Sequence, residues 1–185
     1  MPDLAPGRVH ECMGPAAAAF AARRAAARPG TVIWIAPEGA ETLLPAGLAP
    51  ILPPGRLIRI APATETDLLW AAEECLRSGA AGTVVAQPQK PLGLTPGRRL
   101  QLAAAAGRAT GILIIRDGAG SPAAETRWQC EPLWDAADST RARWCLIKNK
   151  SGTLAEWTVR ADEATGALLV VSAAGQREVA ADPPG

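Results

Sequence analysis

The sequence predicts an α/β protein in which helices flank a mixed, mostly parallel sheet, with antiparallel strands in its C-terminal part. Up to Arg116, short apolar runs alternate with stretches of helical periodicity, as buried parallel strands do with their crossover helices. After Arg116, strand-like runs follow one another with hairpin-type breaks and no helical pattern between them. A chain of 185 residues is long enough to form one such domain around its own core.

Five strands are expected in the first part of the chain, because five short runs are apolar enough to be buried on both faces. They are Arg8–Cys12, Thr31–Ala36, Arg56–Ala61, Gly82–Ala86 and Ala109–Ile115.

The segments between these strands carry helix signals. An alanine-rich run of high helix propensity follows Gly14-Pro15. A second run opens with Thr64-x-x-Asp67, which is similar to a capping box, and is followed by Gly79, a common helix terminator. A third begins at Thr95-Pro96 and stops at Gly107. The expected helices are Pro15–Arg28, Thr64–Ser78 and Thr95–Gly107, with a short helix broken by prolines within Glu41–Leu52.

The second part of the chain begins with a polar, glycine-containing loop, Arg116–Glu125, of a kind that is mobile or binds a ligand. Four strands should follow it, with turns at residues 150–152 and 164–166. They are Thr126–Leu133, Arg141–Asn149, Ala155–Arg160 and Ala167–Ser172. We expect residues 1–6 to be a short N-terminal extension, residues 7–174 to be the core domain and residues 175–185 to be a disordered tail.

Composition excludes several classes of protein. The formal net charge of +1 gives no bulk attraction to nucleic acid or to an anionic membrane. No apolar run approaches the roughly 20 residues that span a bilayer, and no signal peptide is recognisable, so a cytoplasmic location is expected. The four cysteines lie far apart and His10 is the only histidine, so no zinc site is expected. Buried free thiols are favoured over disulfides.

Ligands of such sheets bind at the carboxyl ends of the strands, and the first of these ends is Met13-Gly14-Pro15. A phosphate-binding loop needs G-x-x-x-x-G-K-[ST], with glycines to wrap the phosphate, a lysine for charge and a hydroxyl for Mg²⁺. Counted from Gly14, those three places hold Ala19, Phe20 and Ala21. The sequence therefore predicts a degenerate nucleotide site and no cofactor.

The other strand ends offer no catalytic set. Glu38 follows the second strand and is interpreted as a solvated loop carboxylate rather than a general base. The fourth strand runs into VVAQPQK, which contains no acid that could hold a metal-bound water. His10 is interpreted as a hydrogen-bonded core histidine, and no nucleophile elbow is present. We therefore expect no enzyme, no metal and no small-molecule substrate. The alternative is an enzyme or a nucleotide sensor with an unusual site.

Four segments in order resemble the RecA recombinase core. GRVHECMGP is similar to the strand that opens its ATP site, and VIWIAPEG to its second core strand with the exit glutamate, here Glu38. CLRSGAAGTVV is similar to the strand of the second nucleotide motif, and RWCLIKNKSG to a late strand that ends in a Lys-Asn-Lys turn. The resemblance implies one RecA-like core from Gly7 to Arg160. Because the required lysine, hydroxyl and acid are not there, ATP-driven recombination is not implied.

Within that superfamily, the chain resembles the ImuA family of alphaproteobacterial type, also described as SulA-like. The segments that carry this likeness are GRVHECMGPAAAAFA, DLLWAAEECLRSGA, RRLQLAAAAG and SPAAETRWQC. Family members are encoded in a damage-inducible cassette with ImuB, an inactive Y-family polymerase homologue, and an error-prone C-family polymerase. The resemblance implies an ATP-independent accessory protein of translesion synthesis in the SOS response, which binds these partners. The alternative is a SulA-like cell-division inhibitor, or another SOS regulator that sequesters a protein.

The resemblance also implies candidate contact residues. The loop Arg116–Glu125 takes the place of a DNA-facing loop of the recombinase, and its nearest basic residues are candidates for contact with DNA or a partner, the alternative being a solvated rim. They are Arg116, Arg127, Lys148 and Lys150.

Tryptophans are the other candidate contacts. Trp34 and Trp70 are expected in the core. Core packing is also favoured for Trp128, Trp134, Trp144 and Trp157, although an exposed one among them would anchor a partner. The segment Glu38–Pro54, rich in proline and leucine, is a further candidate contact surface.

Overall fold

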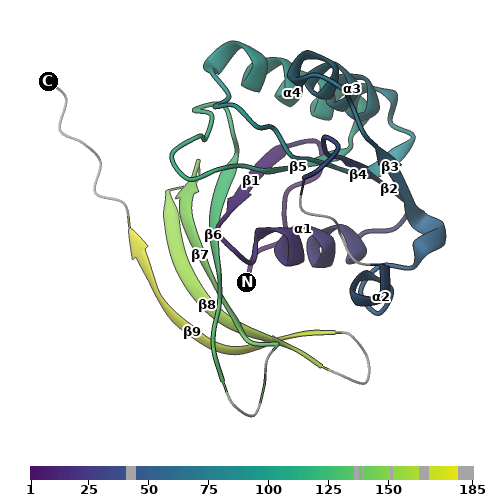
Figure 1. Ribbon diagram of the computed structural model, residues 1–185. Helices are drawn as coiled ribbons and strands as arrows, with labels where there is room; N and C mark the ends of the chain where they lie inside the picture. The colour runs from purple at the N-terminus through teal and green to yellow at the C-terminus, as the bar shows by residue number, and fades with distance from the viewer. Residues whose placement is uncertain (41–44, 136–137, 139, 151, 163–166, 179–185) are drawn as a thin grey trace, which may run out of the picture.

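The computed structural model describes residues 1–40, 45–135, 138, 140–150, 152–162 and 167–178, which form one sheet with helices on both faces (Figure 1). The described strands form a nine-stranded sheet of order β3-β2-β4-β5-β1-β6-β7-β8-β9. Every pairing from β3 to β6 is parallel, and the pairings β6–β7, β7–β8 and β8–β9 are antiparallel. The predicted α/β fold class, with its mixed sheet, is thus confirmed.

The strand bounds follow the apolar runs of the sequence to within about two residues, except at the C-terminal end. The parallel strands are β1 (Val9–Met13), β2 (Thr31–Ile35), β3 (Leu57–Ile60), β4 (Ala81–Ala86) and β5 (Thr110–Ile114). The later strands are β6 (Thr126–Pro132), β7 (Ala142–Asn149), β8 (Thr153–Ala161) and β9 (Leu168–Glu178).

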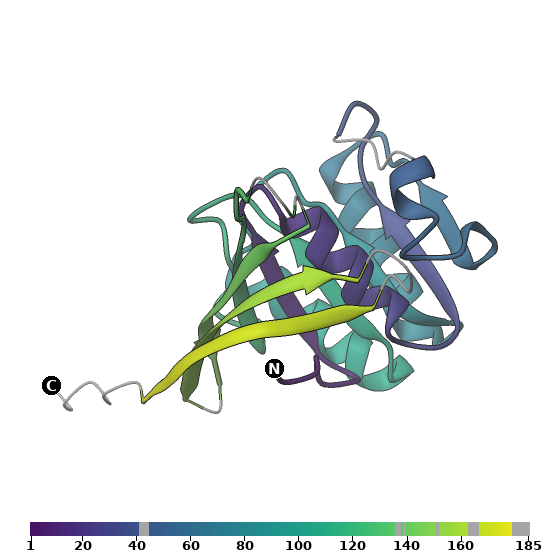
Figure 2. The same ribbon diagram turned by 90° about the horizontal axis from the view of Figure 1, so that it is seen from below.

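Helices cover the two faces of the parallel part (Figures 1 and 2). The first core lies under α1 (Ala17–Ala26) and contains Phe20 together with three tryptophans of β6, β7 and β8. The second core lies under α3 (Glu65–Ser78) and α4 (Leu94–Gly107). A short helix α2 (Pro45–Leu48) is the described part of the proline-broken segment, and residues 41–44 lie outside the described residues. No helix in the described ranges is long and apolar enough to span a bilayer.

The predicted caps of α3 are present. The hydroxyl of Thr64 accepts a hydrogen bond from the Asp67 N–H at 3.1 Å, as a capping residue does. The helix ends at Gly79, whose φ of +67° is a left-handed conformation that glycine adopts without strain. The sequence signal and the backbone geometry agree here because both depend on local hydrogen bonding.

Trp70 corrects a prediction, because its side chain is 63% exposed rather than in the core. The buried side of α3 carries Leu68, Ala72 and Leu76. Trp70 lies two residues after Leu68, and two residues turn an α-helix by about 200°, so the indole projects from the opposite side. Aromatic character alone suggested burial, whereas the helical period decides the outcome.

The two ends of the described chain also differ from expectation. Leu4 is buried in the core under α1, and Arg24 donates hydrogen bonds to the Pro2 carbonyl and to Asp3 at 2.9 and 3.0 Å, so residues 1–6 pack against the domain. At the other end, β9 continues past the expected Ser172 to Glu178, because β8 begins at Thr153 and pairs with it that far. The predicted turn at residues 164–166 and the tail residues 179–185 lie outside the described residues.

His10 is the core histidine that the sequence predicts. Its Nε2 lies 3.1 Å from the Ala5 carbonyl, and its Nδ1 lies 2.7 Å from the Thr126 hydroxyl. The Trp128 indole N–H donates to the same hydroxyl at 2.9 Å. The hydroxyl therefore donates to Nδ1 of a neutral ring while it accepts from the indole. Burial lowers the pKa of His10 to about 4.

We expect this histidine to make the fold acid-sensitive. The unfolded chain takes up a proton near the ordinary pKa of 6.5, whereas the folded chain does so only near 4. The free energy of unfolding should therefore be highest above pH 6.5 and should fall as the pH is lowered toward 4, by about 3 kcal/mol at most from this residue. Urea unfolding at a series of pH values measures it. His10→Gln should show a shallower slope in that window, and equal slopes for the two proteins would contradict this account.

Candidate functional site

The turn between β1 and α1 is closed by β6. The Ala16 N–H donates to the Cys130 carbonyl at 3.0 Å, and the Ala17 N–H donates to the Gly14 carbonyl at 3.0 Å. Gly14 has a φ of +94°, and a Cβ at this position would lie 2.5 Å from the Cys130 oxygen. The N–H groups that would cradle a phosphate in a nucleotide-binding loop are thus partly used, and the turn has no room beside β6.

Phe20 occupies the place of the phosphate-binding lysine, and its side chain is fully buried. Its ring centroid lies 4.7 Å from that of Trp144 in an edge-on arrangement and 5.3 Å from that of Trp128. Ala21 is also buried, whereas Ala19 is exposed at the start of the helix. Phe20 and Ala21, which stand at the lysine and hydroxyl positions of the motif, therefore point into the core and make packing contacts there.

A shallow depression of about 290 Å³ lies at the carboxyl ends of β2, β4 and β5, where ligands of such sheets usually bind. Its lining residues are Gly39, Ala40, Gln87, Pro88, Gln89, Ile114, Ile115 and Arg116. Arg116 donates to the side-chain oxygen of Gln89 at 2.9 Å. Glu38 is exposed in the neighbouring turn and is not among these lining residues. Among the described residues no cluster of histidine, cysteine or acidic side chains could hold a metal ion.

Glu65 is an acid near this depression that the sequence reasoning did not single out. Its carboxylate accepts hydrogen bonds from the Gln89 N–H at 3.1 Å and from the Lys90 N–H at 3.3 Å. The first turn of α3 thereby fixes the loop that follows β4. The sequence does place Glu65 in the first turn of a predicted helix, a position where an acidic side chain often accepts hydrogen bonds from nearby backbone N–H groups.

Arg127 forms an ion pair with a buried carboxylate and is itself only partly exposed, rather than part of an exposed basic rim. Its Nε lies 2.8 Å from Oε2 of Glu11, whose side chain is 0% exposed, and the two residues lie side by side on β6 and β1. The other carboxylate oxygen of Glu11 accepts the Ser121 N–H at 2.7 Å. Arg127 also donates to the Ser121 carbonyl at 3.1 Å. We call this set, Glu11, Ser121 and Arg127, the Glu11 clamp.

The two lysines predicted near the loop also donate hydrogen bonds to its carbonyls. Lys148 donates to the Ser121 and Pro122 carbonyls at 3.1 and 2.8 Å, and Lys150 donates to the Ala123 carbonyl at 3.0 Å. Partial burial and the nearby Arg127 lower the pKa of Lys148. Arg116 is therefore the one of the four predicted basic contacts whose described side-chain hydrogen bond goes to a residue outside this loop, Gln89.

The loop 116–125, for which the sequence predicts mobility or ligand binding, is packed against the domain over most of its length. Ser121, Ala123 and Ala124 are buried. Gln101 of α4 donates to the carbonyls of Val9 and Ala123 at 3.1 and 3.0 Å and so ties helix, strand and loop together.

Two glycines make this close packing feasible. A side chain at Gly97 would overlap Ser121, and one at Gly120 would overlap the Arg127 guanidinium. The exposed part of the loop is limited to residues 116–118 and Pro122.

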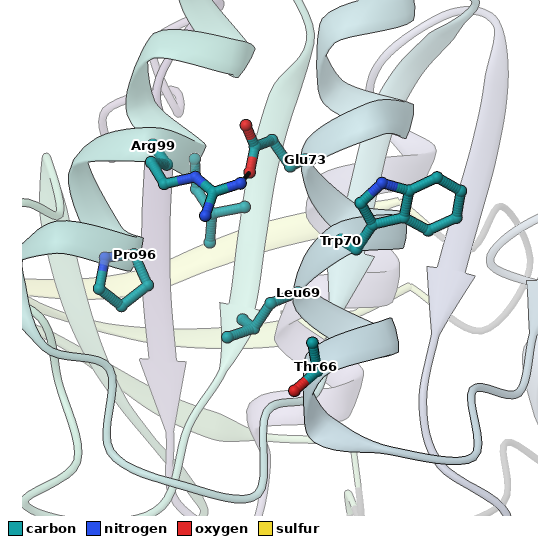
Figure 3. Close-up of a pocket in the computed structure, with 7 residues that line it drawn as sticks. Thr66, Leu69, Trp70, Glu73, Pro96 and Arg99 are labelled. Carbon is teal, nitrogen blue, oxygen red and sulfur yellow. Dashed lines mark ion pairs between the residues drawn. The ribbon is translucent and has the colours of Figure 1, made fainter.

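Trp34, Trp128, Trp144 and Trp157 are buried as predicted. The core packing predicted for Trp134 is wrong, because this residue follows the end of β6 and is 91% exposed, so Trp70 and Trp134 are the exposed tryptophans. Trp70 borders a depression of about 230 Å³ between α3 and α4. Figure 3 shows Arg99 reaching from α4 to Glu73 on α3, at 2.7 Å, while the Trp70 indole points away from α4. The exposed surface of this layer thus combines a large aromatic ring with a charged pair.

Comparison with known proteins shows the fold alone. No family model and no curated protein matches the chain. The crystal structure of SulA from Pseudomonas aeruginosa is similar to it, with a TM-score of 0.50 and 22% sequence identity, over 58% of this chain and 97% of that chain. The chain therefore shares the SulA-like, RecA-like fold that the sequence predicts.

We expect no binding of ATP with Mg²⁺ by titration calorimetry at submillimolar concentration, because Phe20 replaces the phosphate-binding charge and β6 closes the turn. The double variant Phe20→Lys/Ala21→Thr restores the chemical groups of the motif. It should also fail to bind, and should unfold more easily by roughly 3–5 kcal/mol, since it removes an aromatic ring from the core. Clear binding heat from the natural chain would contradict this interpretation.

The Glu11 clamp should contribute strongly to stability. Glu11→Gln removes the counter-charge of Arg127, whose own side chain is 22% exposed, so the loss should be that of a charged hydrogen bond, roughly 1.5–3 kcal/mol. The free energy of unfolding, measured in urea, should fall accordingly. Arg8→Met is the control, because Arg8 is 51% exposed in its 3.7 Å pair with Glu125, and this pair should be worth less than about 1 kcal/mol. Equal effects of the two substitutions would show that the clamp is not a stabilising element.

Proposed function

We propose that this chain is an ATP-independent, RecA-like accessory protein of an error-prone translesion DNA synthesis complex, acting in the cytoplasm during the DNA-damage response. Its partners would be an ImuB-type inactive Y-family polymerase and an error-prone C-family polymerase. The observation that carries the proposal is the burial of Phe20 among tryptophans at the place of the phosphate-binding lysine. A turn built this way offers neither the lysine charge nor the hydroxyl that hold a triphosphate, which supports an ATP-independent role in holding other macromolecules.

The segments that resemble the ImuA family lie together in the fold, which supports the proposal. They form β1 with α1, the helix α3, the middle of α4, and the loop that leads into β6. Three of them meet at one internal network, because Glu11, Gln101, Ser121 and Arg127 each come from these segments. The resemblance therefore covers one contiguous part of the molecule rather than scattered pieces.

The α3–α4 layer supplies a surface suited to a protein partner. Trp70 is exposed, as are Leu94 and Leu102 of α4. Exposed tryptophans are the side chains that most often dominate the binding energy of an interface. The basic residues offer less to DNA, since Arg127, Lys148 and Lys150 spend their donors on the 116–125 loop. Protein binding is thus the better supported activity, and of the four predicted basic contacts Arg116 is the one that DNA could use.

A second candidate function is favoured by one specific observation, the structural similarity to SulA. On this alternative the chain is a SulA-like regulator that sequesters a cell-division protein or another SOS partner. The two functions use the same fold and both act through protein binding, so the identity of the partner separates them.

Co-purification tests the choice. The full chain should retain ImuB and should not retain the cell-division protein, when each is offered separately at equal concentration. Trp70→Ala should weaken retention of ImuB at least about tenfold if Trp70 is the anchor. Trp134→Ala is the comparison variant, because Trp134 is 91% exposed on the β6–β7 connection, against 63% for Trp70 on α3. Loss of retention with Trp134→Ala instead would place the anchor on that side of the molecule. Retention of the cell-division protein alone would favour the second function, and retention of neither would overturn both.

A further inference from the structure

The last strand, β9, lies at one edge of the sheet and is long for such a position. It contains 11 residues and pairs with β8 on one side. In the part of the chain that the structure describes, no strand pairs with its other side (Figures 1 and 2). Edge strands of soluble proteins are usually short, charged or covered, because their free N–H and C=O groups recruit other strands.

The described side chains of β9 are apolar on both faces. Leu169 lies opposite Arg160 and Val170 lies opposite Val159, so these two neighbours point to opposite sides of the sheet. Leu169, Val170 and Val171 are all exposed large hydrophobic residues. The stretch from Ala167 to Ala173 contains no charge, proline or glycine. A strand with apolar side chains on both faces is typical of the interior of a sheet rather than its edge.

The opposite edge of the sheet shows the usual protection. The strand β3 has 4 residues, follows Pro53-Pro54-Gly55 and carries the exposed Arg59 in its middle. A short strand with a central charge recruits other strands poorly. The two edges of this sheet therefore differ, and only β9 offers a long edge that begins with an uncharged, apolar stretch.

We propose that β9 is a dimerisation edge, at which β9 of a second copy of this chain pairs antiparallel about a two-fold axis near Val170. In that register Val170 meets itself, Leu169 meets Val171 and Leu168 meets Ser172. The exposed apolar residues of each strand then lie beside those of the other. The two nine-stranded sheets are then joined through residues 168–172 of each β9, and the contact closes because each copy contributes the same edge.

A second copy fits this edge better than a foreign strand does. The stretch offers no charged side chain with which to select a particular foreign sequence, whereas its apolar residues match themselves in the antiparallel register. The net charge of +1 also means that two copies approach without strong repulsion. Such a dimer involves this chain only and does not depend on the proposed function.

Light scattering coupled to size exclusion tests the proposal on the full chain. A dimer should be populated at about 100 µM protein, a concentration at which micromolar association is nearly complete. Val170→Lys places two like charges against each other at the axis and should raise the dissociation constant at least about tenfold. Ile58→Lys is the matched control, because Ile58 is 52% exposed on β3 and Val170 is 48% exposed on β9. The control should remain a dimer.

Cross-linking tests the register. Val170→Cys should be joined to a second copy by a short bis-maleimide, while the parent chain with its four free cysteines should not be joined at this rate. A chain that is monomeric at every concentration would overturn the proposal. A dimer unaffected by Val170→Lys, or an assembly larger than a dimer, would overturn it equally. Both experiments use the chain without any partner protein. A negative result would therefore overturn the dimer proposal and would not bear on whether the chain retains ImuB.

Discussion

The ion pair between Glu11 and Arg127 is the interaction on which the arrangement of this molecule depends. It joins β1 to β6 at the point where the parallel sheet meets its antiparallel extension. A carboxylate with no exposed surface needs compensation on both oxygens, and here one oxygen receives a guanidinium and the other a backbone N–H of the 116–125 loop. The loop is therefore held as part of the interior. Lys148, Lys150 and Gln101 then complete the hydrogen bonding of its carbonyls.

The turn between β1 and α1 is likewise followed by side chains that pack in the core. Phe20 contacts Trp128 and Trp144, and the ring centroids of Trp128 and Trp157 lie 5.6 Å apart. A series of aromatic rings therefore connects α1 to β6, β7 and β8. Each ring buries a large apolar area, which makes this cluster a main source of stabilisation for the face under α1. In both regions, residues that the sequence resemblance placed at a ligand site make packing and hydrogen-bonding contacts within the fold. The α3–α4 layer and the β9 edge carry exposed apolar side chains, and they are the surfaces proposed above for contact with proteins.

Much of this fold follows from local patterns in the sequence. Apolar runs, the Thr64 cap and the Gly79 stop predict elements correctly because they depend on neighbours in the chain. The position of Phe20 in place of a lysine is likewise visible from spacing. The role of the 116–125 loop was not predictable in this way, because its partners Glu11, Gln101 and Lys148 are distant in sequence. An acid inside the apolar strand VHECM was the available signal, since a buried carboxylate requires a partner. Trp70 was expected in the core because it is aromatic. It is exposed because it lies on the side of α3 that faces away from the sheet.

Amide hydrogen exchange tests the central claim, that the turn before α1 and the 116–125 loop are internal parts of the fold rather than ligand-binding surfaces. The Ser121 amide, which is buried and bonded to Glu11, should exchange as slowly as the amides of the central strands. Added ATP with Mg²⁺, or single-stranded DNA, should leave exchange unchanged from Met13 to Ala21 and from Arg116 to Arg127. Rapid exchange at Ser121, or protection of either segment by these ligands, would contradict the account.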